Sequence, residues 1–222
     1  MAVNTAPLSQ SLAQTQTRAR DITEVIFGFG IMMVVVWLPT REQLIVGPIA
    51  LLSMLALVLV RRPGLNQLGL GWRSLIPSFW ILPAALALTA GSILLAKKAG
   101  TYHPLYSPDF SHVAGYVLWT MYQQFLLQDY FLPRLLRLIP STRSAISIAA
   151  VLFSIVHLPN LPLVAATVVW GAVSCALFLR YRNLYVLGIV QGLLGLTFAV
   201  CIPDALHHHM RVGLGFIRYV AK

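Results

Sequence analysis

Residues 161–179 read LPLVAATVVWGAVSCALFL, and this stretch decides the class of fold. It contains no Asp, Glu, Lys or Arg, and Arg180 and Arg182 follow directly after it. As a helix it reaches about 28 Å at 1.5 Å per residue, close to the roughly 30 Å thickness of bilayer hydrocarbon. Lipid offers no partner for backbone N–H and C=O groups, so an apolar block of this length must be helical to cross it. The stretch therefore predicts a transmembrane helix.

The rest of the chain has the same character. Of its 222 residues 58% are hydrophobic and 10% charged, against about 25% charged in soluble domains. The apolar residues come in long blocks without strand alternation, which favours helices over a β-barrel. We expect an all-α, polytopic transmembrane bundle of about seven spans. They lie near residues 22–38, 44–60, 75–96, 113–139, 145–158, 161–179 and 184–202.

The two ends of the chain are more polar than its middle. Residues 1–20 are rich in Gln, Thr and Ser, which predicts a disordered tail and is too polar for a signal peptide. Residues 21–206 would form the membrane domain, and residues 207–222 a basic C-terminal tail. An apolar stretch near 212–221 is too short to cross and would form at most an eighth, short or re-entrant segment.

A net charge of +10 raises the question of a nucleic-acid partner. The basic residues lie between apolar blocks instead of along one face, which is how Lys and Arg orient a membrane protein. We therefore expect a lipid bilayer and no nucleic acid. A cytosolic N-terminus places ten basic residues on the cytosolic side and six opposite. Because the excess of basic residues marks the cytosolic side, we expect a cytosolic N-terminus, in a bacterial cytoplasmic membrane.

Three groups of polar side chains stand out at membrane depth: Gln123, Gln124 and Gln128 on the fourth expected span, His157 on the fifth and Gln191 on the seventh. Polar groups at membrane depth usually face a protein interior or cavity. The positions predict one pocket lined by Gln124, His157 and Gln191 and reached from the cytosolic half. The alternative is that these groups only hydrogen-bond neighbouring helices together.

Two of these stretches carry a resemblance to a known family. Residues 123–128 read QQFLLQ, and residues 153–160 read FSIVHLPN. With the residues around them, about 113–200, they resemble the CAAX-prenyl-protease and bacteriocin-processing (CPBP, or Abi) intramembrane proteases. That family carries E-E-x-x-x-R on one helix, F-x-x-x-H on the next and H-x-x-x-N/D on a later one. The resemblance implies the fold of an intramembrane endopeptidase and a membrane-embedded or lipidated peptide as partner.

The sequence departs from the family pattern at five of its seven positions. Phe153 and His157 match. The departures are Gln123 and Gln124 for the glutamates, Gln128 for the arginine, Gln191 for the later histidine and Gly195 for Asn or Asp. A register with Asp129 at a glutamate position fits worse, because it places Tyr130 at the other glutamate. The resemblance thus marks Gln123, Gln124, His157 and Gln191 as the catalytic positions of a substituted site.

The substitutions predict impaired chemistry. A glutamine amide has nearly the shape of a carboxylate but cannot take a proton from water, and loss of a general base costs about 10² to 10⁴ in rate. Neutral amides are also poor metal ligands, so we expect neither a metal nor another cofactor. Asp129 lies five residues past Gln124 and would point away from the pocket. The alternative is a non-enzymatic subunit or scaffold that holds a partner helix or a lipid; a transporter ranks below both.

One further cluster has the spacing of metal ligands. Asp204 and His208 are four residues apart, with His207 and His209 beside them. Adjacent histidines at a membrane boundary are more often solvated interface residues than ligands. The sequence analysis therefore predicts no metal there.

Overall fold

The fold was analysed in a computed structural model, which describes residues 6–105 and 109–219. Every regular element within these residues is helical. The α-helices are α1 Ala6–Trp37, α2 Thr40–Leu59, α3 Leu75–Ser78, α4 Ile81–Ala99, α5 Phe110–Phe125, α6 Leu132–Leu138, α7 Thr142–Ile155, α8 Leu161–Tyr181, α9 Leu184–Cys201, α10 Asp204–His207 and α11 Gly213–Ile217. A 3-10 turn, η1, covers Trp72–Ser74, and a π-helix, η2, covers Leu126–Phe131.

Within the described residues, four helices are long and apolar enough to cross a membrane: α2, α4, α8 and α9. Helix α7 is apolar but shorter. The prediction of an all-α integral membrane protein is confirmed, and α2, α8 and α9 begin and end within four residues of their expected bounds. The span expected from residue 75 instead begins at Ile81, because α3 and η1 form short separate turns before it.

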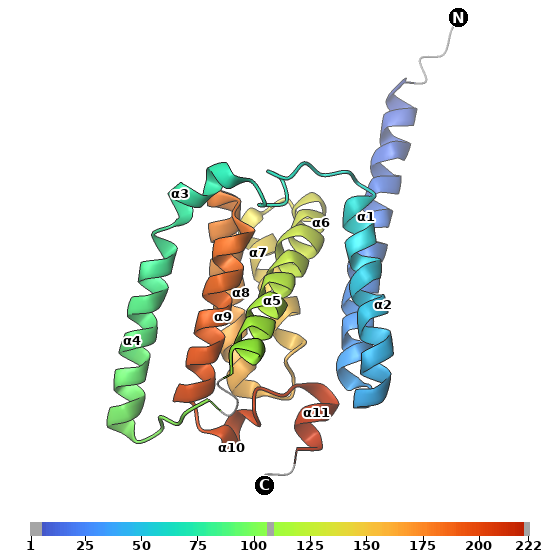
Figure 1. The fold of residues 1–222 in the computed structure, drawn as a ribbon. Coiled ribbons are helices and arrows are strands. Elements are labelled where there is room, and N and C mark those ends of the chain that lie inside the picture. Colours follow the sequence, from blue (N-terminus) through green and yellow to red (C-terminus); the bar gives the residue numbers. More distant parts are fainter. Residues whose placement is uncertain (1–5, 106–108, 220–222) are drawn as a thin grey trace, which may run out of the picture.

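The helices form a bundle with the N-terminal hairpin on one flank (Figure 1). Helices α1 and α2 lie antiparallel at that flank, and α4 lies on the other side of the bundle, against α9. Helix α5 packs against α9 in the centre, and α7 packs against α8. Helices α10 and α11 close the end of the bundle that is far from the N-terminus (Figure 1).

Glycines allow α5 and α9 to pack closely. Gly188 and Gly192 lie four residues apart on α9, and a Cβ atom at Gly188 would meet the Met121 backbone at 2.8 Å. At Gly192 a Cβ would meet a Val117 side-chain atom at 3.0 Å. Small residues at this spacing let membrane helices approach until their backbones nearly touch. This contact fixes which faces of α5 and α9 oppose each other.

Both predicted tails turn out to be structured. Helix α1 begins at Ala6, so the tail expected to be disordered over 1–20 is helical for most of its length; residues 1–5 lie outside the described residues. Its Ala, Leu, Gln and Arg residues are strong helix formers. At the other end, residues 207–219 fold back on the bundle, where the Gly213 N–H donates to the Leu158 carbonyl at 2.7 Å. Residues 220–222 lie outside the described residues.

A buried set of charges fastens the hairpin to the bundle; we call it the N-terminal ionic cluster. Its acids are Asp21 and Glu24 on α1, and its bases are Arg61, Arg134 and Arg137. The Arg134 guanidinium lies 2.6 Å from the Glu24 carboxylate, and Arg137 Nε lies 2.7 Å from the Asp21 carboxylate. Arg61 reaches Asp21 at 2.7 Å and Glu24 at 2.8 Å. The cluster joins α1, α6 and the end of α2.

Candidate functional site

Four glutamine side chains meet at the centre of the bundle and form what we call the amide cluster. Its members are Gln123, Gln124, Gln128 and Gln191. Gln124 Nε2 donates to Gln191 Oε1 at 2.5 Å, and Gln128 Nε2 donates to Gln124 Oε1 at 3.0 Å. Gln191 Nε2 donates to Gln123 Oε1. Gln124 and Gln128 are fully buried, and Gln191 is 8% exposed.

The local helices explain why these four residues meet. Gln124 and Gln128 are four residues apart and share one helix face, and the change from α5 to η2 falls between them. Single π-helical turns inside α-helices are frequent at functional sites. Gln191 reaches the same place because the Gly188 and Gly192 contact turns its face of α9 toward α5.

The orientation of every amide in the cluster follows from Trp170. An indole N–H can only donate, and Trp170 Nε1 lies 3.1 Å from Gln191 Oε1. The oxygen of Gln191 is thereby fixed, so its nitrogen must face Gln123 Oε1, and Gln124 must present its nitrogen to Gln191. This chain of hydrogen bonds, which we call the relay, therefore ends at the NH₂ group of Gln123, which has no partner within the amide cluster. At the other end, buried Gln128 Oε1 has no hydrogen-bond partner among the described residues.

His157 lies on the turn that follows α7 and is 9% exposed. Its Nδ1 lies 2.9 Å from the Phe153 carbonyl oxygen, which can only accept, so Nδ1 carries the proton. The Phe153 ring packs edge-on against the imidazole at 5.3 Å between centroids. Through its carbonyl and its ring, Phe153 therefore orients the His157 side chain. Within the described residues no hydrogen bond joins His157 to the amide cluster.

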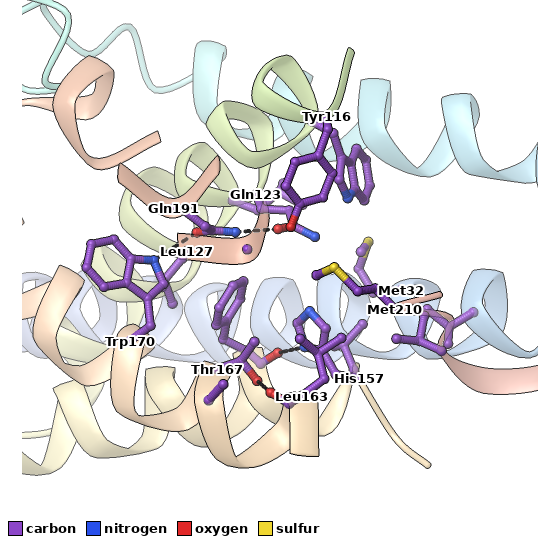
Figure 2. A pocket seen from close by; sticks show the side chains of 18 of the residues that line it. Met32, Tyr116, Gln123, Leu127, His157, Leu163, Thr167, Trp170, Gln191 and Met210 are labelled. Carbon is purple, nitrogen blue, oxygen red and sulfur yellow. Dashed lines mark hydrogen bonds between the residues drawn. The ribbon is translucent and has the colours of Figure 1, made fainter. Parts of the chain in front are cut away.

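A cavity of about 1170 Å³ separates His157 from the amide cluster. His157, Gln123 and Gln191 line it, and Figure 2 shows His157 facing Gln123 and Gln191 across the open space. One detail of the predicted pocket is wrong. Gln124 does not line the cavity, because Gln191 and Gln128 enclose it. The cavity lies toward the α1–α2 turn and Met210, at the end of the bundle away from the N-terminus.

Tyr116 is a cavity residue that the sequence analysis missed. It lies on α5, seven residues before Gln123 and so on the same helix face. A Cβ atom at Gly195 would meet the Tyr116 hydroxyl at 2.0 Å. The phenol therefore occupies the space that a side chain at Gly195 would need. The sequence held one signal for this residue. Gly195 stands at the family's Asn/Asp position, and an aromatic residue lies two helical turns before the glutamines.

The remaining candidates lie outside the cavity. Asp129 is 7% exposed and is not a cavity-lining residue, in line with its predicted direction. Asp204 pairs with His209 at 3.2 Å, while His208 stacks on Phe216 at 4.1 Å between ring centroids. Within residues 6–105 and 109–219, no three His, Cys, Asp or Glu side chains gather into a group that could hold a metal ion.

Comparison with known proteins identifies the central segment. Residues 107–197 match the family model described as Type II CAAX prenyl endopeptidase Rce1-like. No match was found among curated proteins or among solved structures. This match confirms the resemblance to the CPBP family: the segment from 107 to 197 of this integral membrane protein is similar to an Rce1-like domain. All four glutamines of the amide cluster and His157 lie inside it.

Proposed function

We propose that this chain is an Rce1-like membrane protein that binds an apolar ligand in its cavity and does not hydrolyse peptides. One observation carries the proposal. The side chains at the family's two glutamate positions, its arginine position and its later histidine position are four amides bonded to one another. Amides in such a relay bond to one another and hold no group basic enough to take a proton from an attacking water.

The chemistry left at the site supports binding. His157 is the one titratable group of the family motif retained, and among the described residues no Asp or Glu lines the cavity to orient it or to stabilise its charge. A general base needs a partner group that fixes it and balances the charge it gains. The walls are mostly apolar, as in pockets that bind small hydrophobic molecules.

The proposed function includes a topology. The chain would cross the bilayer seven times, through α1, α2, α4, the α5–η2–α6 rod, α7, α8 and α9, with the N-terminus in the cytosol. The arginines of the N-terminal ionic cluster and of the 180–182 turn would then lie on the cytosolic side, as the excess of basic residues there requires. The cavity would lie in the outer half of the bundle. Reporter fusions after Val60 should be cytosolic, and fusions after Ala96 external.

A cleavage assay tests the loss of hydrolysis. The full chain, reconstituted in liposomes, is incubated with a farnesylated CAAX peptide and with a transmembrane peptide. We expect no product above that of empty liposomes. The His157→Ala variant is the control: cleavage by the native chain that disappears in this variant would overturn the proposal. The Gln124→Glu/Gln191→His double variant moves the site toward the family pattern and tests whether the substitutions alone silence it.

A further inference from the structure

The cavity presents one fixed hydrogen-bond donor. The relay that begins at Trp170 turns the Gln123 nitrogen away from Gln191, and within the described residues this NH₂ group has no hydrogen-bond partner. Gln123 is nevertheless a cavity-lining residue. Its orientation is set by neighbours that cannot reverse, since Trp170 has no acceptor to offer. The donor is therefore built into the wall of the cavity.

The same cavity presents one fixed acceptor. Because His157 Nδ1 carries a proton bonded to Phe153 O, the lone pair of the neutral ring is on Nε2. Figure 2 shows the second ring nitrogen turned toward the cavity, and within the described residues it has no hydrogen-bond partner. His157 is only 9% exposed, so its Nε2 is reached from the cavity. A ligand group that donates a hydrogen bond would provide the partner that Nε2 lacks.

Charge is absent from the polar centre of the cavity. Among the described lining residues the one permanently charged side chain is Arg211, and it is exposed and lies over the Tyr219 ring at 5.3 Å. An ionised head group beside His157 and Gln123 would be buried without a counter-charge, which is strongly unfavourable. The head group that fits the centre is neutral.

The cavity is open to the membrane at its sides. Four large apolar lining residues are themselves well exposed, namely Leu44 at 74%, Leu88 at 58%, Trp119 at 40% and Val169 at 64%. Side chains of this kind on a membrane protein face lipid chains. A ligand whose tail extends past them would remain in hydrocarbon along its whole length.

From these observations we propose that the cavity binds an uncharged long-chain alcohol, with its hydroxyl group between His157 Nε2 and the Gln123 amide and its chain toward the lipid. A hydroxyl donates one hydrogen bond and accepts others, so it satisfies both groups at once. An ether or ester accepts only, and an ammonium donates only. The inference rests on the proposed function and specifies the ligand class for that cavity.

Photolabelling with ligands of one chain length tests the head group. The full chain in lipid nanodiscs is labelled with a diazirine analogue of hexadecanol, and unlabelled hexadecanol, hexadecyl methyl ether, hexadecane, hexadecanamide and hexadecyl sulfate compete. We expect hexadecanol to compete at about tenfold lower concentration than the ether, since the ether lacks one hydrogen bond to His157. Hexadecanol that competes no better than hexadecane overturns the proposal. So does tighter binding of the sulfate or of the amide, which would indicate an anion site or a peptide site.

Two variants and two controls connect the result to the named atoms. His157→Phe should reduce the alcohol-to-ether preference to less than about twofold, because it removes the acceptor that only the alcohol uses. Gln123→Leu removes a donor that both head groups use, so it should weaken the alcohol and the ether alike and reduce the alcohol-to-hexadecane preference by about tenfold. Gln67→Leu and His112→Phe replace exposed residues outside the cavity and should keep the full preference. If His157→Phe does not fold, as judged by its melting temperature, Gln123→Leu alone decides, through the alcohol-to-hexadecane preference. An unchanged alcohol-to-hexadecane preference in a folded Gln123→Leu variant overturns the proposal.

The labelling experiment and the cleavage assay fail separately. Alcohol-selective labelling of a chain that also cleaves peptides would leave the ligand assignment standing and overturn the proposed function. Silence in the cleavage assay together with labelling that ignores the head group would overturn the ligand assignment alone.

Discussion

The two buried polar clusters of this protein use opposite chemistry. The N-terminal ionic cluster is built from full charges, with Arg134 1% and Asp21 0% exposed. The amide cluster, deeper along the same α5–η2–α6 rod, is built from neutral groups. Ion pairs can be buried when geometry and hydrogen bonds compensate the lost hydration, whereas neutral amides at membrane depth cost less to insert. The difference indicates that this chain places full charges where it fastens helices and neutral amides at the positions that resemble the family motif.

The largest expected effect is at the ionic cluster. Glu24→Gln removes the charge that compensates Arg134, whose guanidinium is 2.6 Å away and buried. Breaking one side of a buried pair costs about 3–5 kcal/mol, so we expect the melting temperature in detergent to fall by roughly 6–15 °C. Glu42→Gln, at an exposed position in the first turn of α2, is the matched control and should change little. Equal melting temperatures for the two variants would erase the contrast between the clusters.

A smaller loss is expected in the amide cluster. Gln124→Leu removes the bonds to Gln191 and Gln128, but Gln191 keeps Trp170 and Gln128 keeps Ser174 as partners. Interhelical hydrogen bonds in membranes contribute about 0.6 kcal/mol on average and at most about 1.7. We therefore expect a loss of about 1 kcal/mol, measured by reversible unfolding. A cost above that of Glu24→Gln would mean that the neutral cluster is the stronger fastening.

Asp129 lies between the two clusters and belongs to neither. Its carboxyl is buried, and Oδ2 has no hydrogen-bond partner among the described residues. Because an unsatisfied buried polar group costs about 1–3 kcal/mol, Asp129→Leu should raise stability by about 1 kcal/mol, while Asp129→Asn should give no gain. Destabilisation by Asp129→Leu of more than 1 kcal/mol would identify Asp129 as a member of a third polar site.

The sequence was sufficient for the parts of the fold that hydropathy controls. Blocks such as 161–179 and 184–202 became α8 and α9 almost residue for residue, because lipid allows no other structure for them. Hydropathy does not report what a polar segment contacts. The N-terminal tail was expected to be disordered, yet α1 runs through it and carries Asp21 and Glu24. Their partners in the ionic cluster, Arg61, Arg134 and Arg137, lie 37 to 116 residues away along the chain.

In the candidate site, too, the sequence predicted some features and missed those that depend on contacts between helices. The four-residue spacing correctly placed Gln124 and Gln128 on one helix face, and the depth of Gln191 in its own span correctly placed it near them. Which glutamine faces the cavity depends on the π-helical turn and on the glycine contact between α5 and α9, and neither can be read from spacing. Gln123 therefore took the place expected for Gln124, and Tyr116 was missed.

The smallest effect is expected at Asp204, a third ionic group that lies near water, outside the spanning helices. Burial raises the pKa of the Asp204 carboxyl, but hydrogen bonds from the His209 N–H and the Tyr219 hydroxyl, with the positive charge of His209, outweigh it and leave the pKa below its ordinary value. A carboxyl with a lowered native pKa contributes its full stability above its ordinary pKa of 3.8, and that contribution is lost as the pH falls through the native pKa. Because Asp204 is 30% exposed, we expect Asp204→Asn to cost about 1 kcal/mol or less at pH 7, and to be neutral at a pH below the native pKa. Hydrogen exchange of residues 204–219, compared between the unchanged chain and the Asp204→Asn variant across that pH range, measures this difference in stability. A loss as large as that of Glu24→Gln would show that charge alone, and not its burial, distinguishes the ionic cluster from the amide cluster.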